Sequence, residues 1–409
     1  MKLPECRIGF FTSVVGMGGS EVLVADAMEA AAEKGAAIRC WCAPHAAVRD
    51  IVVQRTGMSV EFLDWPKQCN SNCSKPKSAI SNKSYSRTAV ARLWRGIVPA
   101  VVRQVAGFRR DAHRFYQELR RNSPDLLFVN VNGSEAASLG GHWWSRERTI
   151  NCYHLSFTPS NGLVDRLLRR QTIYAAETTV HTSHAVRDQW CHAFGYPESK
   201  TRVIYNGVKT RTYSDRKLKR AELGLSPETF VFCVPGRLHP MKGHRYLLTA
   251  LASCKDQLRK SLVLIAGDGE LSAELESLCQ ANGISEQVRF LGFRNDLPDI
   301  LHACDGTILP SIASENLSVA VLESLMAGTP AIVTRVGGMA EAIEEGRTGF
   351  VVPPCDAKSL ADAILRMIRS SDLGSMRKQS VEQARQRFSR RRMMDEYSAL
   401  FAETLGTCK

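Results

Sequence analysis

Short apolar segments alternate with longer amphipathic segments across residues 230–334, and this alternation limits the folds open to the chain more than any other feature. The short segments predict buried strands, and the longer ones, with apolar residues at helical spacing, predict helices. Strands and helices that alternate with short connections are typical of a doubly wound parallel sheet. The expected strands are Phe230–Pro235, Leu262–Ala266, Val288–Leu291, Gly306–Leu309 and Ala331–Thr334. The expected helices are Gly243–Ser253, Leu271–Gln280, Pro298–Ala303 and Ser318–Ala327.

The first half of the chain begins with the same pattern. A strand at Arg7–Ser13 leads through a glycine-rich loop at Gly16–Ser20 into a helix at Glu21–Lys34 and a strand at Ala37–Cys42. Because 409 residues exceed what one core usually serves, we predict an α/β fold of two doubly wound, Rossmann-like domains, with a boundary near residues 206–229. Further strands of the first domain are expected at Asp125–Asn130, Thr149–Tyr153, Thr178–Thr182 and Thr201–Ile204.

Ligands of open parallel sheets bind outside the carboxyl ends of the strands, so the residues after each expected strand are the first candidates for a site. Gly236 and Arg237 follow the first strand of the second half, and Lys242 comes five residues after Arg237. An arginine and a lysine so placed can bind a diphosphate, although solvated loop charges would give the same pattern. Gly267 and Asp268 follow the next strand and are a weaker candidate, because they fit a simple turn equally well.

Two glutamates stand near the start of the expected helix at 318–327. Glu315 lies in the loop before it, and Glu323 lies inside it. Both carboxylates can accept hydrogen bonds from the vicinal hydroxyls of a sugar ring, and the backbone at Asn316, Leu317 and Ser318 offers helix N-terminal N–H groups to a phosphate. Spacing alone fits two surface glutamates of an ordinary helix as well.

The first domain offers three weaker candidates. The loop containing Gly18 and Gly19 lacks the third glycine and the acidic partner of a dinucleotide site, so it fits close approach of a sugar or an acceptor better than NAD or ATP. His154 follows a buried strand at the same edge of the sheet and is equally compatible with a structural role. Asn206 precedes Gly207 and fits either a turn or a ligand contact.

The composition argues against a metal and against a membrane span. No Asp-x-Asp pair occurs, and the pairs Cys40/Cys42 and Cys69/Cys73 have no second pair at zinc spacing, so we expect no metal, no other cofactor and thirteen reduced cysteines. No apolar run is long enough to cross a bilayer, and only a brief apolar stretch follows Glu5. We therefore expect a cytoplasmic protein.

Positive charge is concentrated in the first half. Residues 1–205 hold 27 Lys/Arg against 17 Asp/Glu, whereas the whole chain has a net charge of +13. Residues 83–121 alone contain ten Lys/Arg with only Asp111 and Glu118, together with Trp94 and other apolar residues at helical spacing; Pro99 is expected to kink or end this helix. A basic amphipathic helix predicts peripheral contact with an anionic membrane, here the inner membrane face; a core-packed helix with a solvated basic face remains the alternative.

Taken together, these residues resemble the family-4 retaining glycosyltransferases of GT-B architecture, and the resemblance covers nearly the whole chain. Each motif is short, but their order and spacing are specific. The matching segments are Gly18-Gly19-Ser20-Glu21, His154, Asn206-Gly207-Val208, Gly236-Arg237, Lys242-Gly243, Gly267-Asp268-Gly269, Glu315-x7-Glu323, Ala327-Gly328-Thr329-Pro330, Gly337-Gly338 with Glu341, Gly346-Arg347-Thr348-Gly349, and Phe388-Ser389-Arg390 with Tyr397 and Phe401.

The resemblance implies a role for each candidate residue. Arg237 and Lys242 would bind the donor diphosphate, Glu323 the ribose and Glu315 the transferred sugar. His154 would lie at the reaction centre, with Gly18 and Gly19 lining the cleft. The implied domains are 1–205 on the acceptor side and 206–387 on the donor side, with a helix at 388–409 crossing back to the first domain.

The implied reaction is retaining, metal-independent transfer of a hexose from a UDP- or GDP-sugar to a hydroxyl acceptor, such as a lipid-linked or cell-surface glycan in polysaccharide biosynthesis. Same-face attack by the acceptor fits, because no carboxylate nucleophile is evident. A sugar-nucleotide epimerase of the same architecture and a non-catalytic nucleotide-sugar-binding scaffold remain alternatives. A nucleic-acid partner is not expected, since no zinc pairs and no helix-turn-helix pattern accompany the positive charge.

Overall fold

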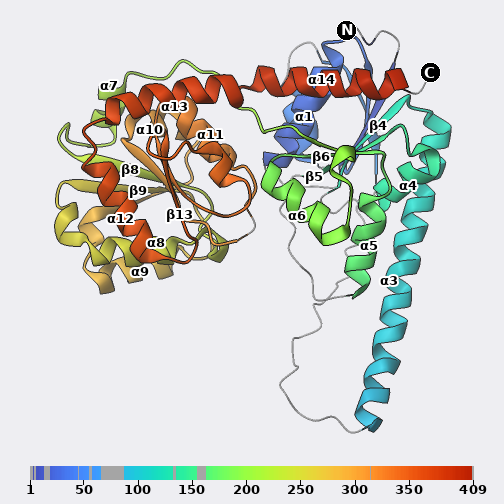
Figure 1. Cartoon of the computed structure of the whole chain (residues 1–409), viewed down its shortest axis with the longest axis horizontal. Coiled ribbons are helices and arrows are strands. Elements are labelled where there is room, and N and C mark those ends of the chain that lie inside the picture. The colour runs from blue at the N-terminus through green and yellow to red at the C-terminus, as the bar shows by residue number, and fades with distance from the viewer. Residues whose placement is uncertain are drawn as a thin grey trace.

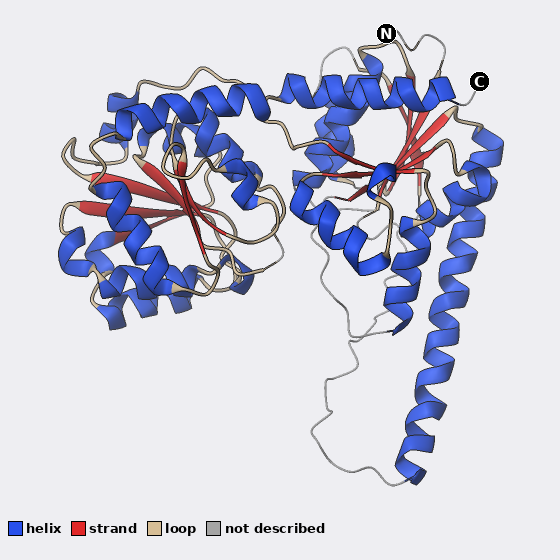
Figure 2. Cartoon of the chain, in the orientation of Figure 1, coloured by secondary structure: helices blue, strands red, loops and turns tan. Residues whose placement is uncertain are grey.

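The computed structural model describes residues 3, 6–12, 19–44, 46–54, 58–65, 87–131, 135–153, 163–313 and 315–407. Its strands form two parallel sheets, of seven strands in the order β3-β2-β1-β4-β5-β6-β7 and of six strands in the order β10-β9-β8-β11-β12-β13. Helices cover both sheets, and the two sheets belong to separate lobes (Figure 1; Figure 2). The predicted class, two doubly wound α/β domains, is confirmed.

The first sheet contains every strand predicted for it and one that was missed. Its strands are β1 Arg7–Phe11, β2 Ala37–Cys42, β3 Val60–Asp64, β4 Leu126–Asn130, β5 Thr149–Tyr153, β6 Thr178–His181 and β7 Thr201–Val203. Its helices are α1 Gly19–Ala32, α2 Ala47–Val53, α3 Arg87–Asn122, α4 Glu135–Ser145, α5 Leu163–Ile173 and α6 His184–Phe194. The edge strand β3 was missed because it is short and only half buried, and therefore lacks the apolar run of a central strand.

The second sheet contains the five predicted strands and adds β13. Its strands are β8 Phe230–Pro235, β9 Ser261–Ala266, β10 Val288–Gly292, β11 Gly306–Leu309, β12 Ala331–Thr334 and β13 Gly349–Val352. Its helices are α7 Arg216–Glu222, α8 His244–Ser253, α9 Ser272–Asn282, α10 Leu297–Ala303, α11 Val319–Met326, α12 Ala357–Ile368 and α13 Leu373–Arg387.

The basic segment folds as one long helix, α3, which projects from the first lobe (Figure 1). Pro99 was expected to kink or end this helix; it does not end it, because α3 continues from Arg87 to Asn122. A proline inside a helix removes one backbone hydrogen bond. The C-terminal part of α3 is held by burial of Ala112, Phe115 and Leu119, so the helix does not depend on that bond alone.

The last helix, α14 (Arg390–Thr407), returns to the first domain and lies along α1 (Figure 1). The rings of Tyr397 and Phe401 are buried against Phe128, with centroids 5.8 and 5.9 Å away. At its start, Arg390 pairs with Asp26 at 2.8 Å and with Glu29 at 2.6 Å. Residues at the far end of the chain therefore complete the core of the first domain.

The two domains are joined where two distant chain segments run side by side. Val208 donates its N–H to the Phe388 carbonyl at 2.8 Å and accepts from the Arg390 N–H at 2.9 Å. Gly207 has no room for a side chain, because a Cβ there would lie 2.7 Å from the Arg390 Cα. This close approach gives the Asn-Gly pair a packing reason to contain glycine.

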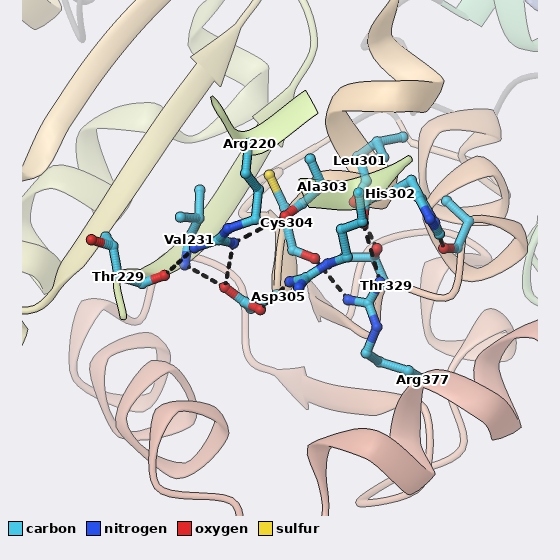
Figure 3. A network of polar contacts seen from close by, with 12 residues as sticks. Arg220, Thr229, Val231, Leu301, His302, Ala303, Cys304, Asp305, Thr329 and Arg377 are labelled. Carbon is cyan, nitrogen blue, oxygen red and sulfur yellow. Dashed lines mark hydrogen bonds and ion pairs between the residues drawn. The ribbon is translucent and has the colours of Figure 1, made fainter. Parts of the chain in front are cut away.

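A buried network of arginines supports the amino-terminal edge of the second sheet (Figure 3). Arg220 donates to Asp305 at 3.2 Å and to the Ala303 carbonyl at 3.1 Å, while Arg377 donates to the His302 and Cys304 carbonyls. These carbonyls end α10, where the helix dipole favours positive charge. Burial, together with the nearby positive charge of Arg216, lowers the pKa of Arg377 to about 10, so the group stays charged near neutral pH.

Removal of the Arg220 side chain should destabilise the second domain specifically. Arg220→Ala leaves Asp305 with one fewer cation and several carbonyls without donors, so we expect a loss of about 3–5 kcal/mol. Urea denaturation followed by far-UV circular dichroism measures this loss. Tryptophan fluorescence reports the first domain separately, because all six tryptophans precede residue 191.

The matched control is Arg259→Ala, which removes an arginine from a fully exposed pair with Asp256. It should change the free energy of unfolding by less than about 0.5 kcal/mol. An equally small effect of Arg220→Ala would contradict a structural role for the network.

Candidate active site

The loops after β8 and β9 pack closely against each other, and both contain a glycine with a positive φ angle. Gly236 and Gly267 have φ angles of +140° and +159°, and a Cβ on Gly267 would lie 1.9 Å from the Gly236 carbonyl oxygen. A cavity of about 350 Å³ opens beside them. The predicted residues Gly236, Arg237, Gly267 and Asp268 all line this cavity, so the structure brings them together.

Phe293 also lines this cavity, although it is not among the residues predicted from the sequence. Its side chain is 76% exposed, next to Arg294, which is held by Asp296 at 2.7 Å. Asp296 is in turn paired with the buried Lys219 at 2.6 Å. An exposed ring beside fixed charges and the exposed Arg237 suits a ligand that has both a flat ring and an anionic group. The signal in the sequence was a large apolar residue in a loop between a strand and a helix.

Lys242 and Glu315 meet at the same edge of the sheet. The Lys242 ammonium donates a hydrogen bond to Glu315 Oε1, and Ser311 Oγ donates to the same oxygen at 3.0 Å. Glu315 is only 8% exposed. Gly243, with φ +72°, brings the chain against the Pro310 carbonyl, where a Cβ would lie 1.9 Å away. This close approach carries Lys242 to the glutamate.

The loop after Glu315 leads into α11, and its backbone is held from two sides. Gly337, with φ +52°, packs on the Glu315 carbonyl, where a Cβ would lie 1.9 Å from the oxygen. Asn206 donates its Nδ2 to the Leu317 carbonyl at 2.9 Å, so the side chain of this predicted ligand residue holds the loop. Ser318 is the N-cap residue but makes no side-chain cap hydrogen bond. First-turn N–H groups of α11 are therefore available to an anion.

Glu323 lies in α11, and its side-chain carboxylate has no hydrogen-bond or ion-pair partner among the residues that the structure describes. Burial raises the pKa of its carboxyl, and the Arg211 guanidinium partly opposes this shift. A half-buried carboxylate without a partner costs free energy unless a ligand supplies hydrogen-bond donors. Hydroxyl groups are suitable donors.

The loop at 315–318 also contacts the first domain. Asn316 Nδ2 donates to Thr182 Oγ1, and Ser183 Oγ donates to Asn316 Oδ1 at 2.7 Å. Nearby, the Glu341 carboxylate accepts from the backbone N–H groups of His184 and Ala185 at 3.0 and 2.7 Å. The two domains therefore touch directly beside Glu315.

The remaining predicted residues belong to the first domain. Gly19 is the first residue of α1, whereas Gly18 and His154 lie outside the described residues. The structure consequently describes the second-domain half of the predicted site and the contact between the domains.

Two protein-family models match the chain in succession. Residues 17–212 match "Glycosyltransferase Family 4" and residues 215–387 match "Glycosyl transferases group 1". Together these matches cover both domains and include every described candidate residue.

Curated relatives match about half of the chain in sequence, and a solved structure of another protein matches nearly all of it in fold. An uncharacterized glycosyltransferase of Methanocaldococcus jannaschii is 32% identical over 49% of this chain and 53% of its own length. An Escherichia coli UDP-Gal:alpha-D-GlcNAc-diphosphoundecaprenol alpha-1,3-galactosyltransferase is 33% identical over 44% of this chain and 48% of its own. The chain thus spans about half the length of these curated relatives. The crystal structure of Anabaena HepE in complex with UDP superposes with a TM-score of 0.73 over 98% of this chain and all of that one, at 22% identity.

Proposed function

We propose that this chain, which belongs to glycosyltransferase family 4 and has the GT-B fold, transfers a sugar from a nucleotide donor to a hydroxyl group of an acceptor. The observation that supports this proposal most strongly is the cluster of Arg237, Lys242 and Glu315 at the carboxyl ends of β8 and β11. It combines cations for a diphosphate with a carboxylate for sugar hydroxyls. The HepE complex with UDP and the named activity of the Escherichia coli relative favour a nucleotide sugar as the donor.

In this proposal the acceptor oxygen attacks the anomeric carbon on the face from which the nucleotide leaves. The bond between the anomeric carbon and the phosphate oxygen breaks, and the acceptor proton passes to the departing diphosphate. Negative charge grows on that diphosphate, so Arg237 and Lys242 lower the barrier by binding it more tightly in the transition state. Glu315 is engaged by Lys242 and Ser311, which favours binding sugar hydroxyls over acting as a nucleophile.

The same proposal assigns residues to the other donor groups. The base of UDP or GDP stacks on Phe293, and the ribose hydroxyls donate to Glu323. The α11 N-terminus adds a positive dipole end. These cations and N–H groups neutralise the diphosphate, so the reaction is proposed to need no divalent metal and no cofactor.

Replacement of either Lys242 or Glu315 by alanine should lower the rate of donor cleavage by about 10²–10³-fold, as expected for loss of a group that stabilises developing charge. The measurement is release of UDP or GDP from a panel of UDP- and GDP-hexoses, with and without EDTA. Lys358→Ala, which changes a lysine that is 90% exposed on α12, is the matched control and should keep the wild-type rate.

A wild-type protein that binds a nucleotide sugar without releasing nucleotide supports the scaffold alternative. Interconversion of the sugar, detected by NMR, supports the epimerase alternative. Loss of all activity in EDTA contradicts metal independence.

Donor binding should weaken as the pH falls through the raised pKa of Glu323. Ribose hydroxyls form stronger hydrogen bonds to an ionised carboxylate than to a neutral carboxyl. Because this pKa lies above its ordinary value of 4.5, protonation begins at a higher pH than for an exposed glutamate. Glu323→Gln should bind about tenfold more weakly at pH 7.5, as for loss of a hydrogen bond to a charged group. It should also lose the pH dependence. Calorimetric titration with the intact nucleotide sugar measures both effects, and an unchanged pH profile in Glu323→Gln would refute the ribose assignment.

The first domain is proposed to lie against an anionic membrane through α3 and α5, which would bring a lipid-linked or surface glycan acceptor to the cytoplasmic side. Arg109 and Arg110 on α3 and Arg166 on α5 are exposed, and so are the apolar side chains of Leu167 on α5 (53%) and Trp143 on the neighbouring α4 (38%). Exposed arginines beside apolar groups are typical of helices that bind anionic lipid surfaces. Within the described ranges no helix has the length and apolar character needed to cross a bilayer.

Charge reversal on α3 should weaken this contact. Arg109→Glu with Arg110→Glu should reduce binding to phosphatidylglycerol-containing vesicles at least about tenfold, from roughly 1 kcal/mol per basic residue. Co-sedimentation at low and high salt gives the measurement. The control pair is Arg259→Glu with Lys260→Glu on the second domain. Binding that is absent, insensitive to salt or equally reduced by the control pair would count against the membrane assignment.

A further inference from the structure

Asn316 is the residue through which the first domain contacts the loop that contains Glu315. Its amide is 7% exposed and faces two hydroxyl side chains, those of Thr182 and Ser183, at the end of β6. Thr182 Oγ1 accepts from Nδ2, and Ser183 Oγ donates to Oδ1 at 2.7 Å. Both ends of the amide are therefore engaged by the opposite domain.

The same contact is strengthened by Glu341. Its carboxylate accepts hydrogen bonds from two backbone N–H groups at the N-terminus of α6 and from the Tyr205 hydroxyl at 2.9 Å. Negative charge is favourable at a helix N-terminus, and hydrogen bonds to a carboxylate are stronger than neutral ones. Gly338, three residues earlier, lies so close to Ser183 that a Cβ there would be 2.4 Å from the serine Cβ.

This interdomain contact is continuous with the proposed catalytic cluster. Asn316 directly follows Glu315, and Gly337, which precedes Gly338, packs on the Glu315 carbonyl. On its other side the Glu315 carboxylate is held by Lys242 and Ser311, both of the second domain. Two residues of its own domain thus hold the Glu315 carboxylate, while the first domain holds the loop to which Glu315 belongs.

We propose that Asn316 is a positioning residue: its amide, bound by Thr182 and Ser183, places Glu315 to orient the transferred sugar only when the two domains are docked. The proposal rests on the proposed sugar transfer. In this scheme the side chain of Asn316 contacts the first domain and not the donor. Misplacement of a reacting group by about 1 Å can cost up to about 10²-fold in rate, so a contact of this kind can control turnover without touching substrate.

The test removes one hydrogen-bonding atom from the first domain. Thr182→Val keeps the shape of the side chain but removes the acceptor for Asn316, and Thr182→Ser keeps the hydroxyl. We expect Thr182→Val to lower kcat for donor cleavage about tenfold, while the Kd for UDP or GDP alone changes less than about twofold, because these nucleotides lack the sugar that Glu315 orients. Thr182→Ser should retain kcat within about twofold.

Three outcomes would overturn the positioning role. They are an unchanged kcat in Thr182→Val, a parallel loss of nucleotide affinity, and an equal loss of kcat in Thr182→Ser. Failure of the wild-type protein to cleave any donor contradicts the proposed function, whereas a normal wild-type rate with an unaffected Thr182→Val rate contradicts the positioning role alone.

Glu341→Gln provides a second, independent measurement if Thr182→Val lowers the Tm. It weakens the same interdomain contact from the opposite side and leaves Asn316 intact. Hydrogen exchange of the Ala185 amide should become faster in the ligand-free variant, and kcat should fall while UDP or GDP affinity is preserved. Faster exchange with an unchanged kcat would show that docking does not position Glu315.

Discussion

The structure depends on the burial of α14 in the core of the first domain. Most of the roughly 180 residues that precede α14 belong to the second domain. Tyr397 and Phe401 occupy the first-domain core beside Phe128, and each buried aromatic side chain contributes about 1.5–3 kcal/mol. Arg390 adds a largely buried pair with Asp26 at the start of the helix. Together with the paired segments at Val208 and Ser389, this packing joins the domains at two points, so their facing edges stay close.

That closeness explains how the candidate site is built. The loops at the carboxyl ends of β8, β9 and β11 approach each other at positions where only glycine fits, and the second domain then meets the first through Asn316 and Glu341. Short loops of the two sheets therefore bring charged side chains, an exposed apolar ring and hydroxyl groups close together.

Sequence reasoning predicted the two sheets and the second-domain half of the site because both depend on local pattern. Apolar runs mark central strands, and glycine and charged residues mark the loops after them. It could not predict that Lys242 contacts Glu315, since that contact depends on the approach of Gly243 to Pro310. Nor could it predict the partners of Asn316 and Glu341, which come from another domain. Phe293 was missed because a large apolar residue in a loop can also pack into the core, and its exposure is known only from the structure.

The return of α14 has a consequence for the order in which the protein is made. Phe10 and Phe128 emerge early in synthesis, but the rings that cover them belong to residues translated more than 250 positions later. The second domain, whose strands and helices lie between β7 and α14, can close its own core before then. Folding on the ribosome should therefore run against the usual N-terminal-first order, leaving the first domain with an uncovered apolar face that chaperones would recognise until α14 is released.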